Sequence, residues 1–282
     1  MIDLPAPIAV VCHDAGATNL ILSWIDPANK IRPVMEGPAA QLWKQRFAGT
    51  ELRTLGDALD DAAALLSGTG WGSDLEHRAR RMARDARIRS VAVIDHWVNY
   101  GERFVRGAEQ VLPDEIWVTD EDALAIARRE FPNLRVELKP NLYLQEQLVR
   151  ARPLADEDRD VLFITEPMRS DWGRGTPGEF QSLEYFLSNR GRAGIPREAC
   201  IRIRPHPADE LGKYESWLGG AVTLDRSPNI GAALDGVRWV VGCQSYALFV
   251  ALKAGRTVIS AIPPWAPPCR LPQNDIVHLA RL

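Results

Sequence analysis

Short apolar segments alternate with amphipathic segments along most of this chain of 282 residues. The clearest apolar segments cover residues 90–94, 161–165 and 237–241, and each is bounded by polar residues or glycine. Such short apolar segments predict buried strands, and strands separated by helices are joined by right-handed crossovers into largely parallel sheets. The pattern therefore predicts an α/β fold.

The expected elements of the first half follow from this alternation. We expect strands at 7–12, 31–35, 51–55, 90–94, 115–119 and 134–138. We expect helices at 19–25, 39–47, 57–66, 75–87 and 122–130. Ser73 and Glu76 have the spacing of a capping box for the helix at 75–87, in which each side chain binds a free backbone N–H group at the start of the helix.

Residues 149–160 are polar and charged, which is typical of a segment between two domains. After this segment the pattern starts again. We expect strands at 161–165, 199–203, 221–224, 237–241 and 257–261, and helices at 179–189 and 246–255. The sequence therefore predicts two Rossmann-like domains, residues 1–150 and 151–282, that face each other across a cleft.

Charge and hydropathy exclude several classes of protein. The net charge is −3 and the isoelectric point is near 6.0, whereas a nucleic-acid-binding domain normally carries a basic stripe. The basic residues between Arg78 and Arg87 have helical spacing, so we expect them on a solvated helix face. No apolar run approaches the roughly 18 residues of a membrane span, and the N-terminus lacks the pattern of a signal peptide. We therefore expect a cytoplasmic protein that neither binds nucleic acid nor spans a membrane.

The most informative motif is Arg204-Pro205-His206-Pro207, which follows an apolar, alternating strand. Each proline fixes its own φ angle and makes the preceding residue extended, so a cation and an imidazole are held on a rigid loop. Ligands of parallel sheets bind just outside the carboxyl ends of the strands, where this loop is expected to lie.

A second polar segment, Gln244-Ser245, joins the strand at 237–241 to the helix at 246–255. The N-terminus of a helix offers backbone N–H groups to an anion. We interpret Arg204, His206, Gln244 and Ser245 together as a site for the phosphate of a nucleotide-activated donor. The alternative for Ser245 is a helix cap, and the alternative for His206 is an inert loop residue.

Two pairs of polar residues follow strands of the first half. Asp95 and His96 end the strand at 90–94, where titratable groups would be poorly solvated and close to a bound substrate. His13 and Asp14 follow the first strand, and Gly16 beside them would let a ligand approach the backbone. This segment lacks the Gly-x-Gly-x-x-Gly motif of dinucleotide sites. The alternative for Asp95 is a loop cap.

Two further residues are candidates for contact with the donor. Glu166 follows the strand at 161–165, where its carboxylate could bind a ribose hydroxyl of the donor nucleoside. Trp71 lies in a glycine-rich loop at 68–72 and could stack on a sugar ring, although a hinge or a plain turn is an equal alternative.

Two Rossmann-like domains, an Arg-Pro-His-Pro motif in the second and a serine at the next strand–helix junction resemble the GT-B glycosyltransferases. The chain is most similar to bacterial surface-glycan enzymes of the sialyltransferase-like, Kdo-transferase-like and CDP-polyol phosphotransferase-like families. In those families such motifs hold the phosphate of a CMP- or CDP-linked donor, which implies this role for Arg204, His206 and Ser245. An acidic residue at the end of an N-domain strand is the base in the sialyltransferases, and Asp95 lies in a similar place.

The resemblance implies sugar transfer from a nucleotide-sugar donor to a hydroxyl of a bacterial surface glycan or glycoconjugate. Arg204 and His206 would stabilise the departing phosphate. Asp95 would take the proton of the acceptor, either oriented by His96 or replaced by Asp14 or His13. We expect no metal ion and no cofactor. Two alternatives remain: a UDP-sugar 2-epimerase-like enzyme, and a non-catalytic nucleotide-sugar or glycan-binding protein of the same fold.

Overall fold

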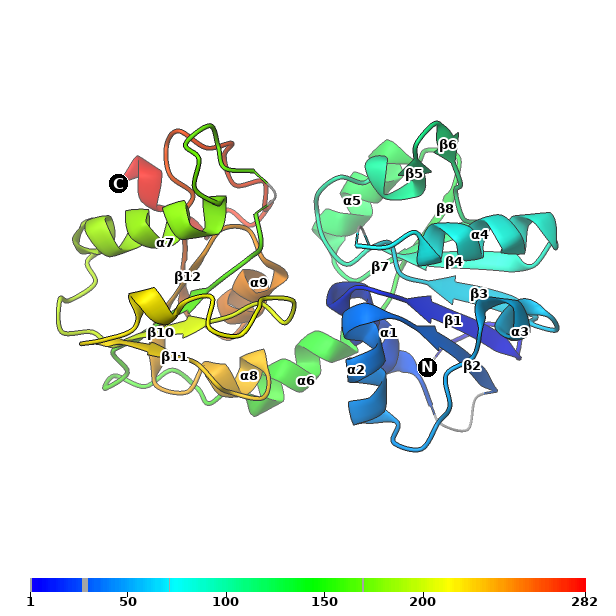
Figure 1. The fold of residues 1–282 in the computed structure, drawn as a ribbon, viewed down its shortest axis with the longest axis horizontal. Helices are drawn as coiled ribbons and strands as arrows, with labels where there is room; N and C mark the ends of the chain where they lie inside the picture. The colour runs from blue at the N-terminus through cyan, green and yellow to red at the C-terminus, as the bar shows by residue number, and fades with distance from the viewer. Residues whose placement is uncertain (1, 27–29, 71, 169) are drawn as a thin grey trace. The chain divides into compact units, whose positions relative to one another are not determined.

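The computed structural model describes residues 2–26, 30–70, 72–168 and 170–282. The chain divides into two compact units, Met1–Tyr143 (unit 1) and Leu144–Leu282 (unit 2). Each unit contains a six-stranded parallel sheet with helices packed against it (Figure 1). The expected α/β class with two Rossmann-like units is confirmed.

The sheet of unit 1 has the strand order β2-β1-β3-β4-β7-β8. Its strands are β1 (Ile8–Cys12), β2 (Ile31–Met35), β3 (Ala64–Ser67), β4 (Arg89–Val93), β7 (Glu115–Val118) and β8 (Arg135–Leu138). A turn η1 (Glu102–Phe104) and a hairpin of β5 (Val105–Arg106) and β6 (Glu109–Gln110) lie between β4 and β7 in the chain. Because β2 and β3 lie on opposite sides of β1, the strand order reverses at β1. Open α/β sheets bind ligands at the carboxyl ends of the strands beside such a reversal.

Helices cover both faces of this sheet. They are α1 (Ala15–Trp24), α2 (Gly37–Arg46), α3 (Leu55–Leu59), α4 (Leu75–Asp85) and α5 (Glu121–Glu130). Ile8, Val10 and Cys12 share a core with α1 and α2, whereas Ala9 and Val11 share a core with α3 and α4. Burial on both faces explains why β1 is a continuous apolar run rather than an alternating one.

Two expected elements of unit 1 are wrong. Residues 51–55, all of them described, form no strand, and the short helix α3 and the central strand β3 replace the expected helix at 57–66. Ala64, Leu65 and Leu66 are fully buried in β3. A short apolar run of this kind is equally consistent with a buried helix, so periodicity does not identify it. The pairing of β3 with β1 and β4 decides its structure.

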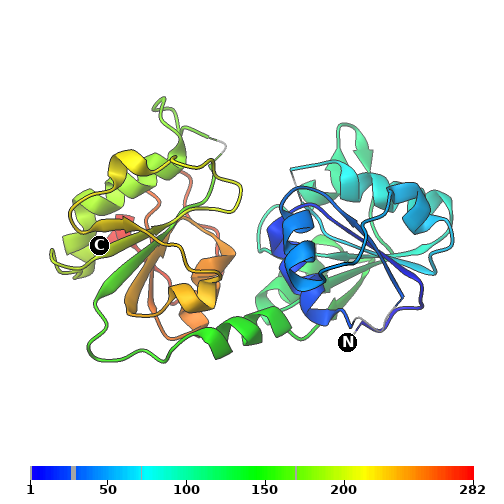
Figure 2. The ribbon, with the colours of Figure 1, turned by 60° about the horizontal axis from the view of Figure 1, so that its bottom comes forward.

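Helix α6 (Leu142–Arg150), green in Figure 2, links the two units along the chain and was not expected from the sequence. Of the linker expected at 149–160, residues 151–159 lie between α6 and β9 and make specific contacts with the rest of unit 2. Asp158 is 3% exposed and accepts a hydrogen bond from the Ala155 backbone N at 2.8 Å. Arg238 Nε donates to the carbonyl oxygen of Asp158 at 2.9 Å. These contacts hold the segment in place.

The sheet of unit 2 has the strand order β11-β10-β9-β12-β13-β14, the Rossmann order with its reversal between β9 and β12. Its strands are β9 (Asp160–Ile164), β10 (Ile201–Arg204), β11 (Val222–Leu224), β12 (Val237–Gly242), β13 (Thr257–Ser260) and β14 (Val277–His278). Its helices are α7 (Gly178–Asn189), α8 (Ile230–Ala233) and α9 (Tyr246–Lys253), with short 3-10 turns η2 (Arg190–Ala193), η3 (Glu215–Trp217) and η4 (Leu279–Arg281).

One hydrophobic core of unit 2 lies between the sheet and α7. Phe163 of β9 and Ile203 of β10 pack in it with Leu183 and Phe186 of α7. Among the helices that the structure describes, none has the length and apolar character that crossing a membrane requires.

Candidate functional site

His13 and Asp14 lie at the carboxyl end of β1, beside the reversal of strand order in unit 1. Asp14 Oδ1 lies 2.6 Å from His13 Nδ1. Because a carboxylate only accepts hydrogen bonds, Nδ1 is the donor, and the neutral ring has its lone pair on Nε2. The two side chains are 19% and 35% exposed, so the pair is half-buried. An imidazole oriented by a carboxylate in this way can serve as a general base.

Three glycines enclose this pair. A Cβ atom at Gly37 would lie 2.6 Å from His13 Nε2, and one at Gly72 would lie 2.8 Å from His13 Cε1. A Cβ atom at Gly70 would overlap the carboxylate of Asp14. Gly37 also has a φ of +51°, which disfavours any side chain. The loops after β2 and β3 therefore need glycine at these positions for His13 and Asp14 to fit.

Two charged residues of α4 are buried beneath the β1–α1 turn and the β3–α4 loop. Glu76 and Arg80 are each 1% exposed. Glu76 accepts the backbone N–H groups of His13 at 3.0 Å and Gly70 at 3.1 Å, and Arg80 donates to the carbonyl oxygen of Gly68 at 3.0 Å. The capping-box role of Glu76 and the solvated position of Arg80 are therefore wrong. Both residues lie on the inner face of α4, and burial is the largest cause that raises the pKa of Glu76 to about 7.

The carboxylate of Asp95, just after β4, is held between two other elements. Oδ1 accepts a hydrogen bond from Arg103 Nη1 at 2.9 Å, and Oδ2 lies against Gly16 of α1, where a Cβ atom would not fit. Arg103 is 4% exposed and also donates to Thr69 Oγ1 at 3.0 Å. Asp95 thus connects β4 with α1 and with the loop after β3.

His96 is half-buried and packs edge-on against Trp97, with the ring centroids 5.4 Å apart. Trp97 is itself buried, and its Nε1 donates to Asp120 at 2.9 Å. From the sequence, orientation of Asp95 by His96 was one of two alternatives for the base. The structure shows that Arg103 binds Asp95. Arg103 was not among the candidates identified from the sequence.

His206 lies on the loop after β10 of unit 2. Its backbone N donates to Thr165 Oγ1 at 3.0 Å and to Asp209 Oδ2 at 2.8 Å. Its Nδ1 accepts a hydrogen bond from the Ala208 backbone N at 3.1 Å. An accepting Nδ1 places the proton of the neutral ring on Nε2. His206 can therefore offer an N–H donor to an anion.

A buried network beneath His206 fixes this loop. The side chain of Asp209 is 2% exposed and accepts from Lys213 Nζ at 2.6 Å, and Lys213 also binds Glu179 of α7 at 2.8 Å. Although burial acts to raise it, hydrogen bonds from Lys213 and from the His206 backbone hold the pKa of Asp209 below its usual range. The sequence reasoning gave Asp209 no role. Its position three residues after His206 is a spacing at which aspartate binds nearby backbone, and this signal could have identified it.

Arg204, the last residue of β10, forms an ion pair at the loop after β11. Its Nη1 donates to the Asp225 carboxylate and to the carbonyl oxygen of Ser227, the latter at 3.0 Å. The Asp225 side chain is 2% exposed and that of Arg204 is 21% exposed. The contact with Asp225 gives Arg204 a structural role that the sequence did not indicate.

The loops after β9 and β12 meet at the reversal of strand order in unit 2. The Gln244 backbone N donates to Glu166 Oε2 at 3.0 Å, and burial raises the pKa of Glu166 above its usual value. Ser245 caps α9, with its Oγ accepting from the Ala247 backbone N at 3.2 Å. Thr165 binds the His206 loop, and the next residue, Glu166, binds Gln244. The candidate residues of unit 2 are therefore gathered at one edge of the sheet.

Acidic residues with the spacing Asp-x-Asp, a pattern that can hold a metal ion, occur at 120–122 and 156–160. Asp120 instead caps α5, and Asp158 pairs with Arg152. Across residues 2–26, 30–70, 72–168 and 170–282, no three His, Cys, Asp or Glu side chains gather as metal ligands would. Trp71, a candidate for sugar stacking, lies outside the described residues.

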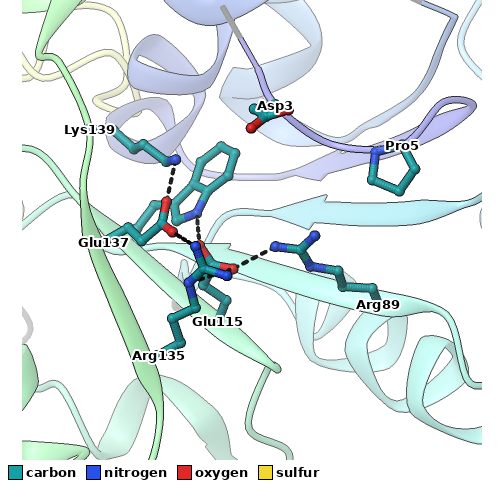
Figure 3. A pocket seen from close by; sticks show the side chains of 8 residues that line it. Asp3, Pro5, Arg89, Glu115, Arg135, Glu137 and Lys139 are labelled. Carbon is teal, nitrogen blue, oxygen red and sulfur yellow. Dashed lines mark hydrogen bonds and ion pairs between the residues drawn. The ribbon is translucent and has the colours of Figure 1, made fainter.

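A cavity of about 200 Å³ lies at the opposite, amino end of the unit 1 sheet (Figure 3). Arg89 and Glu115, at the starts of β4 and β7, line it and are joined by an ion pair of 2.7 Å. Lys139 and Arg135 both pair with Glu137. The charges of this cavity thus neutralise one another, and none of the candidate residues lines it.

The fold is similar to that of several solved structures. One is Staphylococcus aureus MnaA in complex with UDP, with a TM-score of 0.62, 8% identity, and coverage of 90% of this chain and 78% of that one. A second is the glycotransferase of kitacinnamycin, with a TM-score of 0.55, 13% identity, and coverage of 99% and 88%. A third, from Listeria monocytogenes and provisionally assigned as a UDP-N-acetylglucosamine 2-epimerase, has a TM-score of 0.57, 11% identity, and coverage of 90% and 79%. No protein-family profile and no curated protein matches the sequence. At these identities the likeness establishes the fold.

Proposed function

We propose that this protein is a glycosyltransferase that moves a sugar from a nucleotide-activated donor to a hydroxyl group. The observation that carries the proposal concerns two histidines, each at the carboxyl end of the sheet in its own unit: Nδ1 of one donates a hydrogen bond, and Nδ1 of the other accepts one. His13 donates through Nδ1 to Asp14, which leaves Nε2 as a base. His206 accepts at Nδ1, which makes Nε2 a donor. Transfer from a nucleotide-sugar needs both a base for the acceptor and a donor for the leaving phosphate.

In the proposed reaction, His13 Nε2 takes the proton of the acceptor hydroxyl while its oxygen attacks the sugar carbon and the bond to the phosphate breaks. Asp14 keeps the imidazole in the correct tautomer and stabilises the imidazolium that forms. His206 Nε2–H, together with the backbone N–H groups at the start of α9, stabilises the charge on the departing phosphate. Asp95 was the base expected from the sequence. Its two oxygens face Arg103 and Gly16, so we propose that it positions α1.

The finer features of the proposal rest on the motif resemblance. Arg204-Pro205-His206-Pro207 and Ser245 resemble the phosphate motifs of transferases with CMP- or CDP-linked donors, so we propose a cytidine nucleotide donor. Glu166 would contact its nucleoside, and Gln244 its phosphate. We propose residues 1–150 as the acceptor side and 151–282 as the donor side. The acceptor would be a bacterial surface glycan or glycoconjugate, and transfer would occur in the cytoplasm without a metal ion.

The first experiment measures the melting temperature with CMP, CDP, UDP, GDP and dTDP. A ligand at ~100 times its dissociation constant adds about 2.7 kcal/mol to the free energy of unfolding, which such a scan detects. We expect the cytidine nucleotides to raise the melting temperature most. If no nucleotide raises it, the donor site and the proposed function are wrong.

The second experiment compares variants in an assay of nucleotide release from a panel of activated sugars. We expect Asp14→Asn to lower turnover by about 10²–10⁴ with little change in nucleotide affinity, because it removes the group that orients the base. Asp122→Asn, on the exposed side of α5, is the matched control. A larger loss in Asp95→Asn than in Asp14→Asn would return the base role to Asp95. Isomerised sugar would identify an epimerase, and binding without turnover a non-catalytic protein.

A further inference from the structure

Glu76 is a buried acid that contacts the β1–α1 turn, which carries His13 and Asp14, and the β3–α4 loop, which lies against them. We infer that the carboxylate of Glu76 is a positioning residue, which holds the β1–α1 turn and the β3–α4 loop together so that the His13–Asp14 pair keeps its geometry. This inference rests on the proposed function for the role of that pair. The contacts of Glu76 themselves do not depend on it.

The two oxygens of Glu76 each serve a different loop. Oε1 accepts the backbone N–H of His13 at 3.0 Å, and Oε2 accepts the backbone N–H of Gly70 at 3.1 Å. The residue is 1% exposed, so water does not replace either contact. Only a carboxylate offers an acceptor at both oxygens, since an amide or a protonated acid has a donor at one of them.

Arg80, one helical turn further along α4, also binds the β3–α4 loop, at a backbone carbonyl oxygen. It donates to the Gly68 carbonyl oxygen at 3.0 Å and to Ser67 Oγ at 3.3 Å, and its guanidinium lies 5.1 Å from the centre of the Phe104 ring. A Cβ atom at Gly68 would lie 2.6 Å from Glu76 Oε1, so the loop lies directly on the acid. Glu76 thus binds the β3–α4 loop at the Gly70 N–H group, and Arg80 binds it at the Gly68 carbonyl group.

The position of this loop determines the position of Asp14. The backbone of Gly70 lies against the Asp14 carboxylate so closely that a Cβ atom there would overlap it. Asp14 in turn binds His13 Nδ1. A loop released from Glu76 would therefore change the contact between Asp14 and His13, even though Glu76 binds the backbone N–H of His13 and not the side chain of either residue.

Titratable groups from several elements face Glu76. His13 and Asp14 come from the β1–α1 turn, Cys12 from the end of β1, and Arg80 from α4 itself. Burial is the largest cause that raises the pKa of Glu76 to about 7, the Asp14 charge adds to the increase, and the His13 N–H and Arg80 oppose it. Protonation places a hydrogen on one oxygen, which then faces an N–H group as a donor. The two contacts are therefore complete only above a pH of about 7.

The test follows the amide protons of His13 and Gly70 by NMR across pH in the full chain. Because both amides bind one carboxylate, we expect their shifts to titrate together with a single midpoint near 7. Glu76→Gln should abolish both titrations. Asp85→Asn, which changes an exposed acid on the same helix, should leave both unchanged. Separate midpoints, or titrations that persist in Glu76→Gln, would overturn the inference, since they would originate from a group other than Glu76.

The functional consequence is measured with a donor and acceptor pair that the wild-type protein uses. We expect Glu76→Gln to lower kcat by roughly 10- to 100-fold, as misplaced catalytic groups do, and to leave nucleotide affinity unchanged. The rise of kcat through pH 7 in the wild type should be lost in the variant. Unchanged kcat in a variant that has lost both amide titrations would refute the positioning role. A wild-type protein without transfer activity would instead refute the proposed function, and the amide titrations distinguish the two failures.

Discussion

The ion pair between Arg204 and Asp225 leads to a prediction that separates a structural role from a ligand role. In Arg204→Ala the Asp225 carboxylate, 2% exposed, loses the guanidinium that binds it. Removing one partner of a buried pair costs about 3–5 kcal/mol, and the partial exposure of Arg204 favours the lower end of that range. Arg202 Nη1, 3.8 Å from Asp225 Oδ1, compensates in part. We therefore expect a loss of about 3 kcal/mol in the free energy of unfolding.

For a domain of this size, a loss of about 3 kcal/mol corresponds to a fall in melting temperature of roughly 6–12 °C. The assays are thermal unfolding of the variant and calorimetric titration with the nucleotide that stabilises the wild type. Arg226→Ala is the matched control, because Arg226 is the exposed neighbour of Asp225. It should change neither the melting temperature nor the nucleotide affinity.

A double variant tests the cause of the loss. Arg204→Ala combined with Asp225→Asn should be less destabilised than the sum of the single variants, since no buried charge is left unpaired. If Arg204 instead binds the donor phosphate, Arg204→Ala should keep its melting temperature and lose about 1.5–3 kcal/mol of nucleotide affinity, the worth of a charged hydrogen bond. That result would refute the structural reading of the ion pair.

Three further predictions concern His206 of unit 2, Gly16 of unit 1 and the buried acid Glu76 of unit 1. His206→Ala should weaken nucleotide binding by about 1–2 kcal/mol in calorimetry while leaving the unfolding temperature within a degree or so, because it removes a donor from a loop that Asp209 still holds. Unchanged affinity would exclude His206 from the phosphate site. Gly16→Ala should lower the free energy of unfolding in urea by about 1–3 kcal/mol, because the added Cβ atom would displace the Asp95 carboxylate. The control Gly56→Ala, in α3, should be neutral or stabilising, because a Cβ atom there has room. Equal effects of the two substitutions would contradict the close contact between Gly16 and Asp95. Because the pKa of Glu76 is raised to about 7 in the folded protein, folding favours the protonated acid over the carboxylate. The contribution of this acid to stability is therefore complete below the unfolded pKa of about 4.3 and is lost as the pH rises through about 7. The stability of Glu76→Gln relative to wild type should therefore increase from pH 4 to pH 8, and a constant difference across that range would show that the acid is not buried as described.

The sequence by itself determined the class of fold and the chain positions where polar residues meet strand ends. Apolar runs such as 90–94 and 161–165 are identifiable without the structure, because burial on both faces requires a continuous apolar strand. The prolines around His206 fix a loop through local sterics, so that motif was also visible from the sequence. The strand β3 was not, because a short apolar run fits a buried helix equally well and only its pairing with β1 and β4 selects the strand.

Tertiary structure decided which charged residues turn inward. From the sequence, Glu76 was expected in a capping box and Arg80 on the solvated face of the helix. Only the packing of α4 against the sheet places them beneath the β1–α1 turn and the β3–α4 loop. Arg103 binds Asp95 from eight residues further along the chain, and Asp225 binds Arg204 from 21 residues further along, spacings that no local sequence pattern records. The tautomers of His13 and His206 depend on single hydrogen bonds within their own loops, to Asp14 and from Ala208, and the position of each loop depends on buried acids from elsewhere in its unit or loop, Glu76 and Asp209. Local sequence patterns show where a loop begins. The burial and the hydrogen-bond partners of its side chains depend on the packing of the folded chain.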